Sequence, residues 1–199
     1  MFLKSERYRP EDPMPRIDPL SPPYDDVAGP LLASMMPAGA DPILLFRTFA
    51  RNPAMAAAMR TWGSYELGRG LSLSMRQREL VIDRTTARCA CEYEWGVHIA
   101  FFAERVELDA AQISSLTHGS PADPCWSDPA EVALLRGVDE LHDTSRVSDG
   151  CWSALSAHFD PAQILDLLLL AGWYHAISYA ANGARVPLED GAPRFADVV

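Results

Sequence analysis

Three Asp-Pro pairs constrain the fold of this chain more than any other feature of its sequence. They are Asp41-Pro42, Asp128-Pro129 and Asp160-Pro161, and each precedes apolar residues at helical spacing. Aspartate is a favourable N-cap, and proline at the first helical position loses no hydrogen bond. Two pairs also have the spacing of a capping box, because Glu131 and Gln163 follow three residues after their aspartates. These pairs predict the starts of three helices.

The capping-box spacing recurs at Ser74 with Gln77 and at Asp109 with Gln112. No segment has a sustained period-two pattern bounded by turns, so we predict an all-α fold without a sheet. Gly183 is expected to end the last helix. The predicted helices lie near residues 42–51, 53–68, 75–88, 92–105, 110–117, 129–143, 149–158 and 161–182.

The N-terminal region differs from the rest in its proline content. Residues 1–40 hold eight of the sixteen prolines. We interpret them as an extended arm with one short helix around 26–36, and the arm could be a loosely packed tail or lie on a partner subunit. The predicted division is an arm over 1–24, one helical domain over 25–190 and a tail over 191–199.

The composition bounds the possible partners. The chain has 199 residues, 48% of them hydrophobic and 22% charged, with a formal net charge of −10. This charge makes nucleic acid and anionic membrane surfaces unfavourable partners. The start of the chain has no apolar run, and the apolar run 164–173 is too short to span a bilayer. We therefore predict a soluble, cytoplasmic protein whose four cysteines are reduced.

One stretch carries unusual chemistry: Cys91-Glu-Tyr-Glu-Trp-Gly-Val-His98. On a helix, Cys91, Glu94, Trp95 and His98 share one face, within an arc of about 100°. An ordinary amphipathic helix places aliphatic groups there. A buried glutamate and histidine need partners, and a Glu94–His98 hydrogen bond one turn apart would supply them. This pair is either a satisfied core pair or an acid–base site. It supplies only two ligands, so we predict no metal site.

The preceding helix brings in Glu79. In one straight helix, Glu79 would lie about 18 Å from Cys91 and could not reach it. The segment Cys89-Ala-Cys91 is an indifferent helix former, so we predict a break there that folds the two helices together. Cys91 would then lie at a helix start, where the amide dipoles favour a thiolate and nearby carboxylates oppose it.

These residues resemble the carboxymuconolactone decarboxylase and alkylhydroperoxidase D-like family. The segments that carry the resemblance are Arg76-Gln-Arg-Glu79, Cys91–His98 and Gly172–Asn182. The resemblance implies an alkylhydroperoxidase D-like helical bundle, a small-molecule substrate and no cofactor. It also implies a homo-oligomer: a dimer, trimer or hexamer.

The resemblance extends to particular catalytic residues. In the family's peroxidase branch a glutamate precedes a Cys-x-x-Cys motif and a histidine; Glu79, Cys91 and His98 match them, while Glu94 replaces the second cysteine. A dithiol peroxidase needs both thiols. Because Cys89 lies only two residues before Cys91, a disulfide between them would be strained. The decarboxylase branch, which works by proton transfer, is the better match, with Glu79, Cys91, Glu94 and His98 as candidate catalytic residues.

Three hypotheses follow. The first is an acid–base enzyme acting on a small carboxylated or lactone substrate, the second a thiol peroxidase using Cys91, and the third a non-catalytic oligomer that binds a small ligand. Trp95, Tyr174 and His175 are candidate substrate-binding residues, although core positions would also suit Trp95 and His175. Candidate partners for a substrate carboxylate are Arg76, Arg78, Arg84 and Arg88, most of which we expect on a solvated helix face. His118, His142 and His158 are expected to be capping or surface groups.

Overall fold

Helices account for all the regular secondary structure in residues 14–198, which the computed structural model describes. The all-α prediction is therefore confirmed for this part of the chain. The helices belong to two compact units. Unit 1 contains the described residues up to Gly70 together with Ala180–Ala192, and unit 2 contains Leu71–Tyr179 together with the residues from Pro193 onward. The first thirteen residues of the predicted arm lie outside the described residues.

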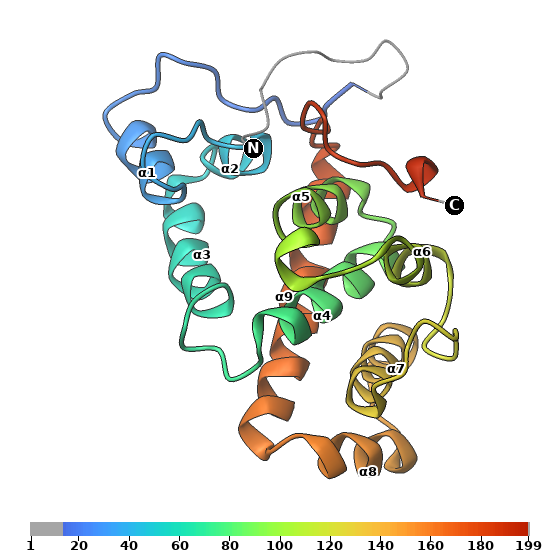
Figure 1. Cartoon of the computed structure of the whole chain (residues 1–199). Helices are drawn as coiled ribbons and strands as arrows, with labels where there is room; N and C mark the ends of the chain where they lie inside the picture. The colour runs from blue at the N-terminus through green and yellow to red at the C-terminus, as the bar shows by residue number, and fades with distance from the viewer. Residues whose placement is uncertain (1–13, 199) are drawn as a thin grey trace. The chain divides into compact units, whose positions relative to one another are not determined.

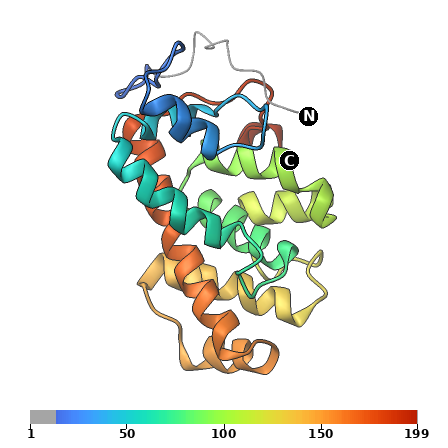
Figure 2. The same ribbon diagram turned by 90° about the vertical axis from the view of Figure 1, so that its left-hand side faces the viewer.

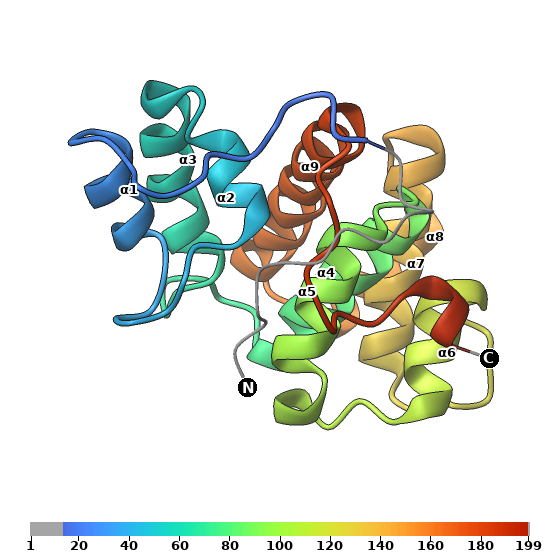
Figure 3. The ribbon, with the colours of Figure 1, turned by 90° about the horizontal axis from the view of Figure 1, so that it is seen from above.

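Unit 1 is built around α3 (Pro53–Glu66), against which α1 (Ala28–Ser34) and α2 (Leu44–Phe49) pack (Figure 3). Residues 14–24 contain no helix or strand. Within the unit they are tied down by backbone hydrogen bonds, such as those from Arg16 N–H to the Ala184 carbonyl and from Leu20 N–H to the Arg47 carbonyl, 2.8 and 3.1 Å long.

Unit 2 holds the candidate site, and α4 lies at its centre (Figure 1). This helix packs against α5, α6 and α7. The elements of the unit are α4 (Met75–Arg88), α5 (Glu92–Phe102), η1 (Glu104–Val106), α6 (Ala110–His118), α7 (Pro129–Thr144), α8 (Asp149–His158) and η2 (Phe195–Asp197). The long helix α9 (Pro161–Ala184), which runs from orange to red in Figure 2, contributes residues to both units.

Two apolar clusters form the core of unit 2. One joins α4, α7, α8 and α9 through side chains such as Ile82, Leu134, Leu155 and Leu170. The other joins α4, α5, α6 and α7. Because α4 contributes to both clusters, it is buried on several faces, and its polar residues must find partners inside the protein.

Local sequence signals explain both ends of α4. Ser74 and Gln77 form the predicted capping box at its start. At its end Ala90 takes the left-handed conformation, with a φ of 49°. The Cys91 N–H donates to the Thr86 carbonyl and the Ala90 N–H donates to the Ala87 carbonyl, each at 2.9 Å, which is the Schellman pattern of a helix end. The predicted break is confirmed, and Cys91 becomes the N-cap of α5.

Two predicted helix starts need correction. Asp41 does not cap a helix, because α2 begins at Leu44, whose N–H donates to the Glu189 carboxylate at 2.5 Å in unit 1. Asp128 does cap α7, but Glu131 forms no capping box with it. Glu131 instead accepts a hydrogen bond of 2.5 Å from the Arg76 side chain. In both cases a distant side chain outcompetes the local one.

The last helix also differs from its prediction. It continues through Gly183 to Ala184 and ends where Arg185 takes a φ of 53°. By length and composition alone α9 could cross a membrane, whereas the sequence pattern indicated a run too short for that. Half of its most apolar window is buried, and the core helix of a soluble protein passes the same test, so this is weak support for a membrane span. A cytoplasmic location stays a prediction.

Candidate active site

The break between α4 and α5 brings Glu79 and His98 together. Glu79 Oε2 lies 2.7 Å from His98 Nδ1, although the two residues are nineteen positions apart in sequence. Glu79 is fully buried and His98 is only 4% exposed. A carboxylate can only accept this bond, so Nδ1 carries the proton. The predicted site therefore has Glu79 as the direct partner of His98.

The second nitrogen of His98 faces two more polar groups. Tyr174 Oη lies 3.1 Å from Nε2, and the tyrosine ring meets the imidazole edge-on with ring centroids 5.2 Å apart. Glu94 Oε1 lies 3.5 Å from the same nitrogen, too far for a good hydrogen bond. The predicted Glu94–His98 pair therefore forms a longer contact, and the interhelical contact with Glu79, at 2.7 Å, is the shorter of the two. Glu94 Oε2 has no hydrogen-bond partner among the described residues.

Two further ionisable residues of α4 belong to this cluster. Arg78 binds Glu79 Oε1 at 2.5 Å, and both side chains are buried. Asp83 is also buried, and its carboxylate lies within 4.8 Å of the ligand atoms of Glu79 and His98. Burial and the Glu79 charge raise the pKa of Asp83 well above its usual value. Burial and the neighbouring Glu79 therefore favour the neutral form of Asp83, which limits the negative charge inside the protein.

The charge of His98 follows from competing effects. Burial alone would lower its pKa, but the Glu79 carboxylate outweighs burial and Glu94 adds to the effect, so the pKa of His98 rises to about 10. His98 is consequently an imidazolium at neutral pH, with both ring nitrogens acting as donors. It can give up the Nε2 proton towards Glu94 or a bound substrate, while Glu79 stabilises the charge.

Cys91 has a different electrostatic environment. Its side chain is fully buried, and burial together with the Glu94 carboxylate raises the pKa of Cys91 to about 12. The thiol is therefore protonated at neutral pH, and burial and the carboxylate overcome the helix dipole that favours a thiolate. All four cysteines lie in the described part of the chain, and none of them forms a disulfide.

The aromatic side chains near the site have separate roles. Phe102 is half-buried and stacks on His98 with ring centroids 5.4 Å apart. The guanidinium carbons of Arg78 and Arg105 lie 5.0 and 5.7 Å from the Phe102 centroid. Trp95 is fully buried in the core of unit 2 and packs against Phe195. Its indole N–H has no hydrogen-bond partner among the described residues.

The structure separates His175 from the other predicted site residues. His175 Nε2 lies 3.0 Å from His142 Nδ1, and Cys89 Sγ lies 3.9 Å from the same His142 atom. These three residues form a second group whose ligand atoms lie within 4.8 Å of one another. Glu79, Asp83 and His98 meet the same distance criterion. In that group the imidazolium has no free lone pair, which makes metal binding unfavourable.

The four arginines of α4 are largely structural. We expected most of them on a solvated face, but Arg78 and Arg84 are buried. Arg84 binds both oxygens of Asp139, at 2.7 and 2.9 Å, and donates to three carbonyls at the end of α6. Arg76 and Arg88 form ion pairs with α7. Only Arg78 reaches the His98 cluster, through Glu79.

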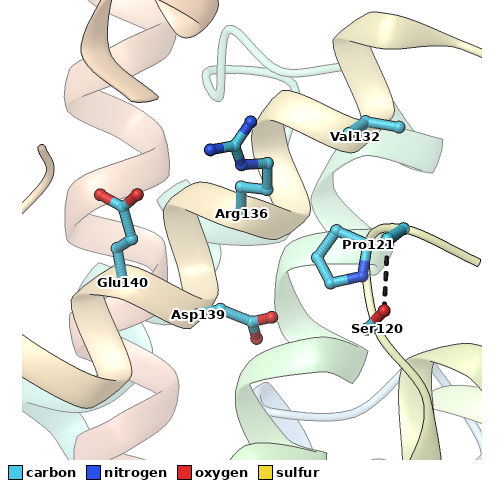
Figure 4. Close-up of a pocket in the computed structure, with 7 residues that line it drawn as sticks. Ser120, Pro121, Val132, Arg136, Asp139 and Glu140 are labelled. Atoms are coloured by element: carbon cyan, nitrogen blue, oxygen red, sulfur yellow. Dashed lines mark hydrogen bonds between the residues drawn. The ribbon is translucent and has the colours of Figure 1, made fainter. Parts of the chain in front are cut away.

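A surface pocket of about 410 Å³ lies elsewhere in unit 2, against α7. Its lining residues are Ser120, Pro121, Ala122, Val132, Arg136, Asp139 and Glu140 (Figure 4). The Asp139 carboxylate is bound by Arg84, and Glu140 accepts hydrogen bonds from the Ser148 N–H and hydroxyl. Both carboxylates in the lining therefore have structural partners, and we assign the pocket no catalytic role.

Sequence reasoning missed three residues of the two clusters. Asp83 lies one helical turn after Glu79, so helical spacing could have identified it. Phe102 lies one turn after His98 and has the same signal. The contact of His142 with His175 joins α7 to α9, and no local pattern in the sequence indicates it.

Comparison with proteins of known structure identifies the fold that carries this site. No family model and no curated protein matches the sequence. Solved structures do match. An Agrobacterium tumefaciens protein described as a putative antioxidant defence protein AhpD is 20% identical, with 69% of this chain and 92% of that chain covered at a TM-score of 0.63. A peroxidase-related protein with an alkylhydroperoxidase AhpD core, from Ralstonia eutropha JMP134, is 19% identical, with 73% and 76% covered at 0.65.

A third solved structure is the debrominase Bmp8, which is 11% identical, with 87% of this chain and 91% of that chain covered at a TM-score of 0.71. At these identities the similarity establishes the fold and leaves the reaction open. The predicted helical bundle is therefore confirmed: this chain has the alkylhydroperoxidase D-like fold.

Proposed function

We propose that this protein is an acid–base enzyme that decarboxylates a small carboxylated or lactone substrate. The main support is the charged His98, which Glu79 holds at 2.7 Å on one nitrogen while the other faces Glu94 and Tyr174. The Nε2 proton of this buried imidazolium faces the Glu94 carboxylate, one oxygen of which has no hydrogen-bond partner among the described residues. His98 can therefore act as a proton donor to a substrate bound beside it.

In the proposed reaction the substrate carboxylate leaves as carbon dioxide. The electrons of the broken carbon–carbon bond move into the conjugated lactone carbonyl, which forms a dienolate. His98 then donates its Nε2 proton to the vacated carbon, and the neighbouring Glu94 carboxylate passes a proton from solvent back to His98. Because the developing negative charge forms beside an imidazolium, the transition state gains more from His98 than the ground state does.

Substrate would approach His98 from the side that the Phe102 ring covers. This ring covers His98 and is half-buried, whereas Glu79, Glu94 and His98 are buried. Arg78 and Arg105 lie against the same ring and supply positive charge for a substrate carboxylate. In this proposal Tyr174 orients the substrate, Trp95 supports the wall of the site, and the protein works as a homo-oligomer in the cytoplasm.

A thiol peroxidase that uses Cys91 is the second candidate. The neighbouring structures described as peroxidase-related or as a putative antioxidant defence protein favour it. The Bmp8 neighbour is described as a debrominase, and a cysteine-to-alanine variant of that protein has been solved in complex with 2,3,4-tribromopyrrole. Against a thiol reaction, the full burial of Cys91 and its pKa of about 12 keep the thiol protonated.

The test is carbon dioxide release, in heavy water, from a panel of α,β-unsaturated γ-lactones that carry the carboxylate on the γ-carbon. We expect turnover with one deuterium incorporated at the vacated carbon, and we expect Glu94→Gln and His98→Gln to reduce kcat by about 10²-fold or more. His158→Gln, at an exposed position, is the matched control. Circular dichroism checks that each variant is folded.

The same preparations are then given an organic hydroperoxide, and free thiols are counted before and after. Peroxide turnover that is lost in Cys91→Ser and retained in Glu94→Gln would overturn the acid–base proposal in favour of thiol chemistry. Absence of both reactions, with every variant folded, would favour the non-catalytic hypothesis.

A further inference from the structure

Three potential metal ligands converge away from the His98 cluster. They come from three helix segments: Cys89 at the end of α4, His142 in the last turn of α7 and His175 in α9. The Cys89 Sγ and the His175 Nε2 both face His142 Nδ1, at 3.9 and 3.0 Å. None of the three is fully buried.

The hydrogen bonding of His175 fixes which of its nitrogens faces His142. Its Nδ1 lies 2.8 Å from the Ala171 carbonyl, which can only accept, so Nδ1 carries the hydrogen. In the neutral imidazole, Nε2 is then the nitrogen with the lone pair, and it faces His142. A histidine whose outer N–H donates to a backbone carbonyl is the usual arrangement of a metal-bound histidine.

The surrounding charges are compatible with a cation. Arg88 is the nearby positive group, and it is paired with Asp139 and Asp143. These two carboxylates offset its repulsion of a divalent ion.

The spacing of the three atoms suits tetrahedral coordination. With metal–nitrogen and metal–sulfur bonds of about 2.0 and 2.3 Å, donor atoms around one zinc ion lie roughly 3.3–3.6 Å apart. The observed 3.0 and 3.9 Å bracket that range, so small side-chain movements would suffice. A pocket of about 290 Å³ adjoins the group, and its lining includes His142, His175, Ser145 and Tyr179.

We propose that Cys89, His142 and His175 bind a zinc-class divalent ion, with the fourth coordination position open to water or a small ligand in the adjoining pocket. A thiolate with two imidazoles favours zinc over magnesium or calcium, which prefer oxygen ligands. The sequence analysis predicted no metal site, because these residues are separated by more than thirty positions between each pair. The proposal shares no residue with the acid–base cluster.

The test is titration of the reduced, chelator-treated full chain with Co²⁺ under anaerobic conditions. We expect visible bands of tetrahedral intensity and a sulfur-to-cobalt charge-transfer band, both removed by adding Zn²⁺. Cys89→Ser should abolish the charge-transfer band, and His175→Gln should weaken binding by more than about tenfold. Cys125→Ser is the matched control, since Cys125 is also half-buried and lies outside the group.

A second measurement, made on the unmodified protein, tests the proposal even if Cys89→Ser or His175→Gln fails to fold. In the unmodified protein Zn²⁺ should protect one thiol from alkylation, and mass spectrometry should place the protection at Cys89. Cobalt binding that is unchanged in both Cys89→Ser and His175→Gln would overturn the proposal, as would the lack of any cobalt bands or of any thiol protection.

Discussion

Replacing Glu79 with glutamine tests the electrostatic basis of the candidate active site. Glutamine keeps the size of the side chain and an oxygen that can accept from His98, but it removes the negative charge 2.7 Å from Nδ1. In the unmodified protein, the difference between the ordinary pKa of 6.5 and about 10 corresponds to about 5 kcal/mol in favour of the imidazolium.

In Glu79→Gln, burial still opposes the charged form, and the carboxyl groups that remain near His98, those of Glu94 and Asp83, support it less than Glu79 does. We therefore expect the pKa of His98 to fall well below its value of about 10 in the unmodified protein. The measurement is an NMR titration with labelled histidine, and His98→Gln assigns the signal among the five histidines. Glu104→Gln, an exposed change of the same chemical kind, should leave the titration unaltered.

The same variant should change how stability depends on pH. Because the folded-state pKa of His98 is raised, its stabilising contribution is fully present below pH 6.5 and is lost as the pH rises towards 10. Over that window His98 alone lowers the free energy of unfolding by up to about 1.4 kcal/mol per pH unit. Urea unfolding at several pH values should show this slope in the unmodified protein and a flatter one in Glu79→Gln.

Two results would refute this reasoning. One is a His98 signal in the unmodified protein that titrates near pH 6.5, which would mean that Glu79 does not hold the imidazolium. The other is an unchanged midpoint in the folded Glu79→Gln variant, which would assign the effect to a different group.

Three further changes test other parts of unit 2. Relative to the unmodified protein, the free energy of unfolding of Asp83→Asn should be higher at pH 8 than at pH 4. The reason is that the pKa of Asp83 is raised in the folded state, so the stabilising contribution of Asp83 is lost as the pH rises above 3.8. Urea unfolding of both proteins at the two pH values checks this. Gly119→Ala should cost about 1–3 kcal/mol by chemical denaturation, since its Cβ would lie 2.0 Å from Asp123 Oδ2; an unchanged midpoint would argue against this packing. Asp166→Ala should cost about 2 kcal/mol, because its carboxylate accepts from the Ser72 N–H and hydroxyl at 2.7 and 2.6 Å; Asp149→Ala, at an exposed helix start, should cost less by the same assay.

Several features of the fold could be predicted because their causes are local. The capping boxes at Ser74 and Asp109 formed as expected, since each closes within one helical turn. The break at Ala90 was also predictable, because the hydrogen bonds of a helix end join residues a few positions apart. The predictions for Asp41 and Glu131 were wrong because of residues distant in sequence. Glu189 accepts from the first N–H of α2 where Asp41 was expected to cap, and Arg76 binds the carboxylate of Glu131.

By itself, the sequence determined an all-helical chain, a sharp turn between two helices, and the placement of Glu79, Glu94 and His98 on them. Only the tertiary structure decided that Glu79 is the direct partner of His98. It also decided that the His175 side chain contacts His142 and lies outside the acid–base cluster. The reason is physical. A cap depends on one stretch of backbone, whereas a contact between helices depends on the relative position and rotation of both, which the packing of the whole core sets.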